Sequence, residues 1–272
     1  MTLLDGRTIA SELRAAAKEA AASLSPVLAA VVATADPGAA WYAGSIARSA
    51  EATGIELRET RLAAHDVAGV LATLDALSTD PGVHGIICLT PLPGGLTLAD
   101  AGERIAPAKD VDGASPASLG RLAAGLPAFA PATAQAVIEL LRHSGTALEG
   151  ADTVVVGRSI VVGKPLALLL LAENATVTVC HTRTRDLAEV TRRAGILVAA
   201  AGRTWDAPRR CVRPGAVVID VGTNEAPDGS MVGDVDTAAV EPVASLVTPV
   251  PGGVGPVTTA VLLRNVVTAA AS

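Results

Sequence analysis

A glycine-bounded loop between an apolar strand and an apolar helix is the clearest candidate for chemistry in this sequence. The run Thr153–Val156 leads into Gly157-Arg-Ser-Ile-Val-Val-Gly163-Lys-Pro165, and the apolar stretch Leu166–Leu171 follows. Such a turn directs backbone N–H groups at the N-terminus of a helix, where a diphosphate can bind, and Arg158 and Ser159 add a cation and a hydroxyl. The spacing is not Gly-x-Gly-x-x-Gly, and glycine also serves such turns for steric reasons alone. The loop predicts a phosphate site and leaves a purely structural role open.

The end of the next apolar run indicates which nucleotide would bind. Thr176–Cys180 is followed by His181-Thr182-Arg183. In a dinucleotide-binding domain, an acid at the end of the second strand binds the 2′-hydroxyl of NAD. That acid is missing here, whereas Thr182 and Arg183 offer a hydroxyl and a cation to a 2′-phosphate, so the sequence favours NADP as the cofactor. A solvated loop is the alternative interpretation of Arg183.

Short apolar runs separated by helical patterns must position these loops. The runs that we predict as strands are residues 27–33, 85–89, 153–156, 176–180, 196–199 and 217–220. Continuous apolar strands that alternate with helices are typical of a parallel sheet covered on both faces. The sequence therefore predicts an α/β fold.

A proline-rich stretch at residues 127–134 suggests a boundary between two lobes, because it interrupts this pattern before the helical stretch 135–144. We predict a substrate domain at residues 1–134, completed by a C-terminal helix at 257–272. Residues 135–256 would form a Rossmann-like nucleotide-binding domain, with a cleft between the two lobes. At 272 residues and 50% apolar composition, the chain can fill two cores.

Composition argues against several kinds of partner. The net charge of −6 is spread without a basic stripe, so no nucleic-acid face is expected. No apolar stretch is long enough to span a bilayer, and the first ten residues do not resemble a signal peptide, so we expect no membrane partner and a cytoplasmic protein. The three cysteines are widely spaced, which predicts buried reduced thiols.

No metal site is predicted. Asp234 and Asp236 lie close together, but no cluster of His or Cys accompanies them. His65, His84 and His143 are isolated along the chain, and we interpret each as a surface or satisfied histidine.

Several motifs then resemble those of one family. In chain order they are Tyr42, Pro91-Leu-Pro93, Lys109-Asp-Val-Asp-Gly113, the loop 157–165, Cys180-His-x-x-Thr184, Gly215–Gly222, Val232–Asp236 and Thr248–Pro256. Together they are similar to the bifunctional methylenetetrahydrofolate dehydrogenase/cyclohydrolase family, in the same order and along nearly the whole chain.

The resemblance implies a function in one-carbon metabolism and a role for each motif. A reduced folate would lie between the lobes, with Tyr42 against its rings and Asp112 bonded to the pterin, and both residues are our catalytic candidates. The segment Pro251-Gly252-Gly253 would also contact the substrate. The family forms homodimers through its nucleotide-binding domain. We place NADP on Gly157, Arg158, Ser159, Gly163, His181, Thr182, Arg183, Gly222 and Thr223.

Two positions depart from the family pattern. The family carries Lys four residues after the tyrosine, and this chain has Ile46 there; the family glutamine that precedes Leu-Pro-Leu-Pro is Leu89. On a helix, Ile46 lies one turn from Tyr42. A buried glutamine left without its lysine would cost about 1–3 kcal/mol, so the paired loss indicates an adjusted site.

These departures separate the two family reactions. Hydride transfer needs mainly the alignment of two bound molecules, whereas hydrolysis of the methenyl group needs an acid–base residue, whose loss costs about 10²–10⁴-fold. We therefore predict an NADP-dependent 5,10-methylenetetrahydrofolate dehydrogenase with weak or absent cyclohydrolase activity. The alternatives are an enzyme of the same fold recruited to another reaction, ordinary bifunctional activity with Lys109 as a displaced amine, and a catalytically silent binding protein.

Overall fold

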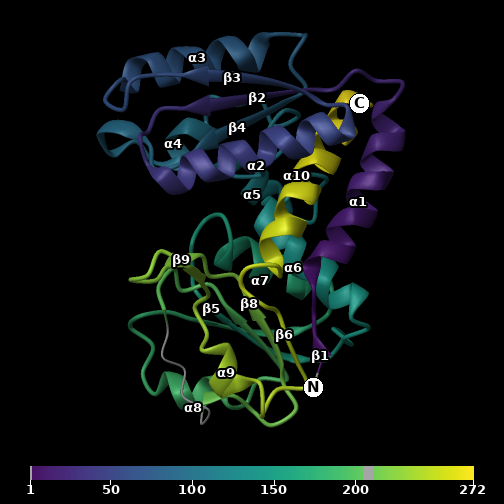
Figure 1. Cartoon of the computed structure of the whole chain (residues 1–272), viewed down its shortest axis with the longest axis vertical. Coiled ribbons are helices and arrows are strands. Elements are labelled where there is room, and N and C mark those ends of the chain that lie inside the picture. Colours follow the sequence, from purple (N-terminus) through teal and green to yellow (C-terminus); the bar gives the residue numbers. More distant parts are fainter. Residues whose placement is uncertain (1, 205–210) are drawn as a thin grey trace. The chain divides into compact units, whose positions relative to one another are not determined.

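The computed structural model describes residues 2–204 and 211–272, and its described part forms two compact units (Figure 1). Residues 11–132 and 259–272 form what we call the three-stranded unit. Residues 2–10, 133–204 and 211–258 form the six-stranded unit. Both are α/β, as predicted. The first ten residues differ from the predicted division, because β1 (Thr2–Leu3) pairs with β11 (Leu246–Val247) in the six-stranded sheet.

The three-stranded unit is built on a parallel sheet with the order β3-β2-β4. Its strands are β2 (Val27–Val32), β3 (Glu56–Arg61) and β4 (Gly85–Leu89). Alternate residues of β2 and β4 pack with α3 (Val67–Thr79) and α4 (Leu98–Gly102) in one apolar core. Figure 1 shows α2 (Pro37–Thr53) on the face of the sheet opposite α3. Both faces of β2 are therefore covered, which explains its uninterrupted apolar run.

The six-stranded unit has a wholly parallel sheet with the order β1-β11-β8-β7-β5-β6. Its longer strands are β5 (Asp152–Val156), β6 (Thr176–Cys180), β7 (Ile196–Ala199) and β8 (Val217–Asp220). A short antiparallel pair, β9 (Asn224–Glu225) and β10 (Met231–Val232), follows β8. The remaining elements are α1 (Gly6–Ala21), η1 (Pro93–Gly95), α5 (Pro116–Ala123), α6 (Ala132–His143), α7 (Gly163–Ala172), α8 (Leu187–Thr191), α9 (Thr237–Val240) and α10 (Val254–Ala270).

All six predicted strands are confirmed to within a residue at either end. The sequence did not reveal β3, because Glu56-Leu-Arg-Glu-Thr-Arg61 is charged and exposed along most of its length. A charged edge strand discourages pairing with other chains. The three cysteines are buried, as predicted. Among the described residues, no helix has the length and apolar content needed to cross a membrane.

Candidate active site

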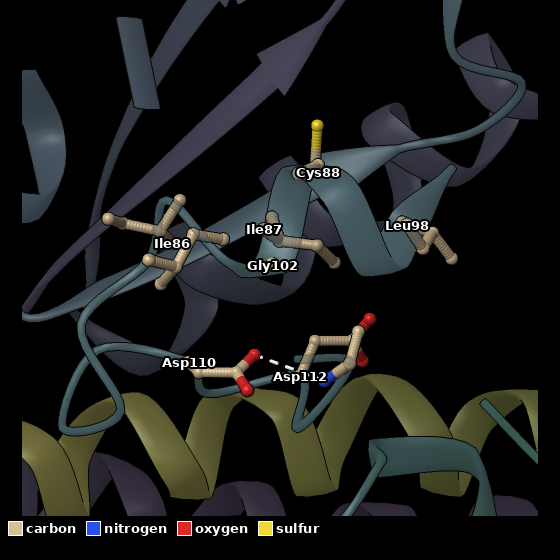
Figure 2. Close-up of a pocket in the computed structure, with 10 residues that line it drawn as sticks. Ile86, Ile87, Cys88, Leu98, Gly102, Asp110 and Asp112 are labelled. Carbon is tan, nitrogen blue, oxygen red and sulfur yellow. Dashed lines mark hydrogen bonds between the residues drawn. The ribbon is translucent and has the colours of Figure 1, made fainter. Parts of the chain in front are cut away.

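In the three-stranded unit, Asp112 lies in a loop beside residues Ile86–Cys88 of β4 (Figure 2). The residue is half-buried, and burial raises the pKa of its carboxyl to about 7. The neighbouring charge of Asp110 raises this pKa further, and the backbone N–H of Ala132 opposes the shift. Asp112 therefore changes its charge near neutral pH, which is unusual for a carboxyl group.

A small apolar pocket adjoins Asp112 in Figure 2. Its lining residues are Ile86, Ile87, Cys88, Leu98, Ala101, Gly102, Ile105, Asp110, Asp112 and Ala114. Its volume of about 10 Å³ is that of roughly one water molecule, so it cannot itself receive a pteridine ring. Burial raises the pKa of the Cys88 thiol to about 12, which keeps this thiol protonated at neutral pH.

Tyr42 lies on α2, whose start is well defined. Asp36 caps the helix by accepting a 2.8 Å hydrogen bond from the Ala39 N–H, and Pro37 occupies the first turn. Burial raises the pKa of the Tyr42 phenol, and the charge of Asp112 raises it further. Asp112 is thus close enough to Tyr42 to affect it, so the structure brings together these two predicted residues.

The two departing positions are both part of the apolar interior. Ile46 is 0% exposed, one helical turn after Tyr42, and Leu89, the last residue of β4, is 3% exposed. The register pairs Leu89 with Val32, so β2 and β4 end at the same edge of the sheet. α2 begins just after β2 leaves that edge. The chain therefore places apolar side chains beside the edge where ligands of parallel sheets bind.

The Lys109 amine has a structural role. Its Nζ donates to the carbonyl oxygens of Asp80, at 2.5 Å, and Leu77, at 3.3 Å. Both carbonyls lie at the C-terminal end of α3, where a cation is stabilised by the helix dipole. The amine therefore faces α3, which weakens the interpretation of Lys109 as a displaced catalytic group.

In the six-stranded unit, the predicted phosphate loop connects β5 to α7. A Cβ on Gly157, which has a φ of +142°, would lie 2.1 Å from the carbonyl oxygen of Ala200. A Cβ on Gly163 would lie 2.1 Å from the carbonyl oxygen of Gly157. The steric interpretation of both glycines is therefore supported, and it is compatible with a phosphate site because the same tight turn leads into a helix N-terminus.

One polar side chain of this loop stabilises the turn, and another is exposed to solvent. The Ser159 hydroxyl accepts a 3.1 Å hydrogen bond from the Val162 N–H, whereas Arg158 is exposed. α7 begins without a side-chain capping bond. After β6, His181 Nδ1 accepts from the Arg183 N–H at 3.1 Å, so His181 helps to shape its own turn. Thr182 and Arg183 are exposed there.

Most predicted cofactor residues follow strands that end together. The register aligns Val156 with Cys180 and with Ala199, and aligns Ala199 with Asp220. The loops after β5, β6 and β8 consequently leave the same carboxyl edge of the sheet. Those three loops carry eight of the nine residues that the sequence analysis assigned to NADP, including the buried Gly222 and the exposed Thr223, and the ninth, Gly163, begins α7 directly after the β5 loop.

A buried carboxylate network, which the sequence analysis missed, supports this edge. Asp220 accepts hydrogen bonds of 2.8–2.9 Å from the N–H groups of Gly222, Asp234 and Val235. Burial raises the pKa of Asp220, and these backbone bonds oppose the shift. Asp234 accepts in turn from the N–H groups of Ala201 and Gly202 after β7. The two aspartates join three loops.

This network also explains the Asp-rich motif. Asp236 caps α9 by accepting from the Ala239 N–H, and Asp234 is occupied with backbone groups. No group of three or more potential metal ligands was found among residues 2–204 and 211–272. The sequence did contain a signal for this network, namely the two glycines at positions 222 and 233. Gly222 leaves room for Asp234, and Gly233 leaves room for Asp220, because a Cβ on either glycine would come within 2.4 Å of the facing aspartate.

The segment Pro251-Gly252-Gly253 belongs to the six-stranded unit, whereas Tyr42 and Asp112 belong to the three-stranded unit. The Gly6 N–H donates to the carbonyl oxygen of Gly252 at 2.9 Å, and a Cβ on Gly6 would meet the Gly253 carbonyl oxygen at 1.9 Å. Gly252 has a φ of +114°. The rigid-loop interpretation of this segment is thus supported, and its predicted contact with substrate stays a prediction.

Together, these features define a two-unit α/β protein with a nucleotide-type loop at the carboxyl edge of one parallel sheet. Comparisons with known proteins give the family. Residues 4–112 match the tetrahydrofolate dehydrogenase/cyclohydrolase catalytic domain, and residues 131–272 match the NAD(P)-binding domain of the same family. The chain belongs to the tetrahydrofolate dehydrogenase/cyclohydrolase family.

Individual relatives agree over the full length. The bifunctional protein FolD of Parafrankia sp. (strain EAN1pec) is 55% identical, with 99% of each chain covered. The solved structure of the bifunctional FolD of Campylobacter jejuni has a TM-score of 0.95 and 38% identity, covering 100% of this chain and 99% of that one. The Trypanosoma brucei enzyme, solved with NADP and an inhibitor, has a TM-score of 0.92 and 33% identity, with coverage of 99% and 97%.

Proposed function

We propose that this protein is an NADP-dependent 5,10-methylenetetrahydrofolate dehydrogenase with weak or absent methenyltetrahydrofolate cyclohydrolase activity. The observation that carries the proposal is the buried apolar pair Ile46 and Leu89, at the positions where the family resemblance expects lysine and glutamine. The nucleotide loop and Asp112 are retained. The residues that differ are those needed for one reaction of the two.

The dehydrogenase reaction makes modest demands on side chains. Tyr42 would pack against the rings of the folate, and the ionised Asp112 carboxylate would accept two parallel N–H bonds from the pterin. Bound NADP supplies the acceptor for a hydride from the methylene bridge. The protein contributes by holding the two molecules in alignment, which needs no proton transfer from position 46.

The hydrolytic reaction requires an activated water molecule and a proton relay. Isoleucine and leucine have no group that can carry a proton. The amine that could have substituted, Lys109, donates to two carbonyls at the end of α3. These contacts support a cyclohydrolase rate that is lower by about 10²–10⁴-fold than that of an enzyme with the general acid–base group.

Ordinary bifunctional activity is the second candidate, and one observation favours it. The Parafrankia relative, 55% identical over the whole length, is described as bifunctional. This candidate requires an acid–base group other than position 46. Asp112, whose pKa is raised to about 7, is the described side chain in the three-stranded unit best suited to that role.

For the cofactor, we propose NADP in preference to NAD. The exposed Arg158, Thr182 and Arg183 could hold the 2′-phosphate, and Gly157 and Gly163 shape the turn that receives the diphosphate. The Trypanosoma brucei relative was solved with NADP, which supports the choice.

We further propose a homodimer formed through the six-stranded unit. β6 is an edge strand of the sheet, and Val179 on it is 39% exposed. Leu171 on the neighbouring α7 is 55% exposed. Exposed apolar groups beside an unpaired strand edge suit pairing with a second copy. Light scattering of the purified protein should give the mass of two chains.

One assay tests the central proposal. The purified protein is supplied with 5,10-methylenetetrahydrofolate and NADP, and NADPH and 5,10-methenyltetrahydrofolate are followed together. We expect both to form at equal initial rates, and the methenyl product then to decay only at its spontaneous rate. Rapid conversion of the methenyl product favours the bifunctional candidate. No NADPH at all contradicts the proposal and favours a repurposed or silent protein.

A further inference from the structure

The neighbours of Asp112 in its loop are each held in place, and the Ala132 backbone N–H interacts with the Asp112 carboxyl itself. The Lys109 side chain is bound to the end of α3, and its carbonyl oxygen accepts from the Ile86 N–H at 2.9 Å. The Asp110 carboxylate accepts from the Ala114 and Ser115 N–H groups and from the Ser118 hydroxyl, which stands at 2.6 Å. Gly113 has a φ of +60°, and a Cβ there would lie 2.5 Å from the Phe129 carbonyl oxygen.

The remaining residue of the loop, Val111, is held by the C-terminal helix. The Asn265 side-chain amide of α10 donates to the Val111 carbonyl oxygen at 2.9 Å, across 154 positions of sequence. Asn265 is 8% exposed. This is a buried polar side chain with one long-range partner, and that partner is the carbonyl that precedes the Asp112 N–H.

Packing reinforces the same contact. A Cβ on Gly85 would lie 2.8 Å from Val111 Cγ2 and 3.1 Å from Val266 Cγ2. The Val111 side chain therefore fills the space above Gly85, next to the residue that follows Asn265. Hydrogen bond and packing act on one peptide unit, and rotation of that peptide would turn the Asp112 side chain.

We infer that Asn265 is a positioning residue for Asp112: its amide holds the Val111 peptide and so fixes the direction in which the Asp112 carboxyl leaves the loop. Asn265 would act through the backbone, without touching substrate. The expected effect on folate binding rests on the function proposed above; the effect on Asp112 does not.

The inference can be tested without any ligand. The charged state of Asp112 is followed by carboxyl ¹³C NMR as pH is varied, in the parent and in Asn265→Leu, which is similar in size but has no donor. Among the described residues, the titratable groups that act with Asp112 are Asp110 on its own loop and Tyr42 on α2, whereas Cys88 on β4 lines the same pocket with its sulfur pointing away from Asp112 (Figure 2). We expect the Asp112 midpoint, near 7 in the parent, to fall by about one pH unit as the loosened loop admits water.

Thr53→Val is the matched control. The Thr53 hydroxyl is also buried, and it donates to the Ser49 and Ala50 carbonyls within α2, about 16 Å along the helix from Tyr42. This substitution removes a buried hydrogen bond of similar kind and should leave the Asp112 midpoint unchanged. If Asn265→Leu does not fold, Asn265→Ala serves instead. An unmoved midpoint in a folded Asn265 variant, or equal shifts in the variant and the control, would overturn the inference.

Calorimetry with tetrahydrofolate then separates this inference from the proposed function. We expect Asn265→Leu to weaken binding about 10-fold in the parent and less in an Asp112→Asn background, because coupled residues are not additive. NADP affinity should not change. If Asn265→Leu shifts the Asp112 midpoint but the parent binds no reduced folate, the positioning role is supported and the proposed function is rejected. Full additivity would contradict the positioning role.

Discussion

The two units of this protein carry their functional residues in different ways. In the six-stranded unit, the nucleotide loops are constrained by backbone sterics, since Gly157 and Gly163 each leave no room for a Cβ. The side chains proposed to contact NADP, such as Arg183, are exposed and make few demands on the fold. In the three-stranded unit, Asp112 belongs to a loop that is held in place by side-chain hydrogen bonds.

This difference bears on the loss of the cyclohydrolase reaction that we propose. The side-chain hydrogen bonds that hold the Asp112 loop involve neither residue 46 nor residue 89. Replacing both with apolar residues leaves no buried polar atom unsatisfied within the described residues. Under the proposed function, positions 46 and 89 can therefore change while the loop that carries Asp112 is retained.

The nucleotide loop is expected to be the most sensitive to substitution. Gly163→Ala would force a Cβ to within 2.1 Å of the Gly157 carbonyl oxygen, so the turn must open. We expect NADP affinity to fall at least about 100-fold, which corresponds to about 2.7 kcal/mol. Gly255→Ala is the control, because no described atom lies within 4 Å of its added Cβ at the start of α10. Calorimetric titration of both variants decides, and equal affinities would break the steric account.

The sequence predicted six apolar strands, two in the three-stranded unit and four in the six-stranded unit, and the positions of the nucleotide loops, because apolar runs and glycine turns are local signals. It did not predict the Asp220–Asp234 network or the bond from Asn265 to Val111. Those contacts join residues 14 and 154 positions apart, and a single sequence carries no record of such pairs. The interpretation of Lys109 also needed the structure, since its spacing gives no hint that its amine faces α3.

The enclosed site should respond selectively. Asp112→Ala removes the proposed partner of the pterin without altering the six-stranded unit. We expect tetrahydrofolate affinity to fall by about 10–100-fold, the range for a charge-assisted hydrogen bond, with NADP affinity nearly unchanged. Calorimetry with each ligand provides the comparison. Unchanged folate affinity would show that the role carried over to Asp112 from the family is wrong.

The exposed cofactor contacts should matter less than the turn glycines. Arg183→Ala removes one cation from the proposed 2′-phosphate site and leaves the His181 turn, which uses the backbone of residue 183. We expect NADP to bind about 10-fold more weakly, with NAD unaffected, because only NADP carries that phosphate. The measurement is the ratio of the two dissociation constants. Tighter binding of NAD than of NADP in the parent would contradict the cofactor assignment.

A further expected effect is on stability. The folded pKa of Asp112, about 7, lies above its ordinary value of 3.8, so the native state binds this proton more tightly than the unfolded state. The ionised carboxylate therefore costs stability, fully above pH 7 and decreasingly as pH falls from 7 to 4. Asp112→Asn should raise the free energy of unfolding at pH 8 by about 1–3 kcal/mol, and this gain should shrink at acid pH.

Asp100 provides a control of opposite sign. Its hydrogen bonds from Thr97 lower the pKa of its carboxyl, so its ionised form contributes stability that is present above pH 4 and lost below. Asp100→Asn should lower stability at pH 8, with the difference fading in acid. Urea denaturation of both variants at pH 8 and pH 4 tests the pair. The same sign of change at pH 8 would contradict the account of Asp112.

We propose that Ile46 and Leu89 weaken or abolish the cyclohydrolase activity, and one measurement tests this most directly. The rate of loss of 5,10-methenyltetrahydrofolate absorbance is compared for the parent, for Ile46→Lys with Leu89→Gln, and for the apolar control Ile46→Met with Leu89→Met. Ile46→Lys alone should gain little, because burial without a polar partner lowers the pKa of an amine. We expect the parent and the control to match the spontaneous rate and the Lys–Gln double variant to exceed it, by up to about 10²–10⁴-fold. An enzymatic rate in the parent, or no gain in a folded double variant, would contradict the account.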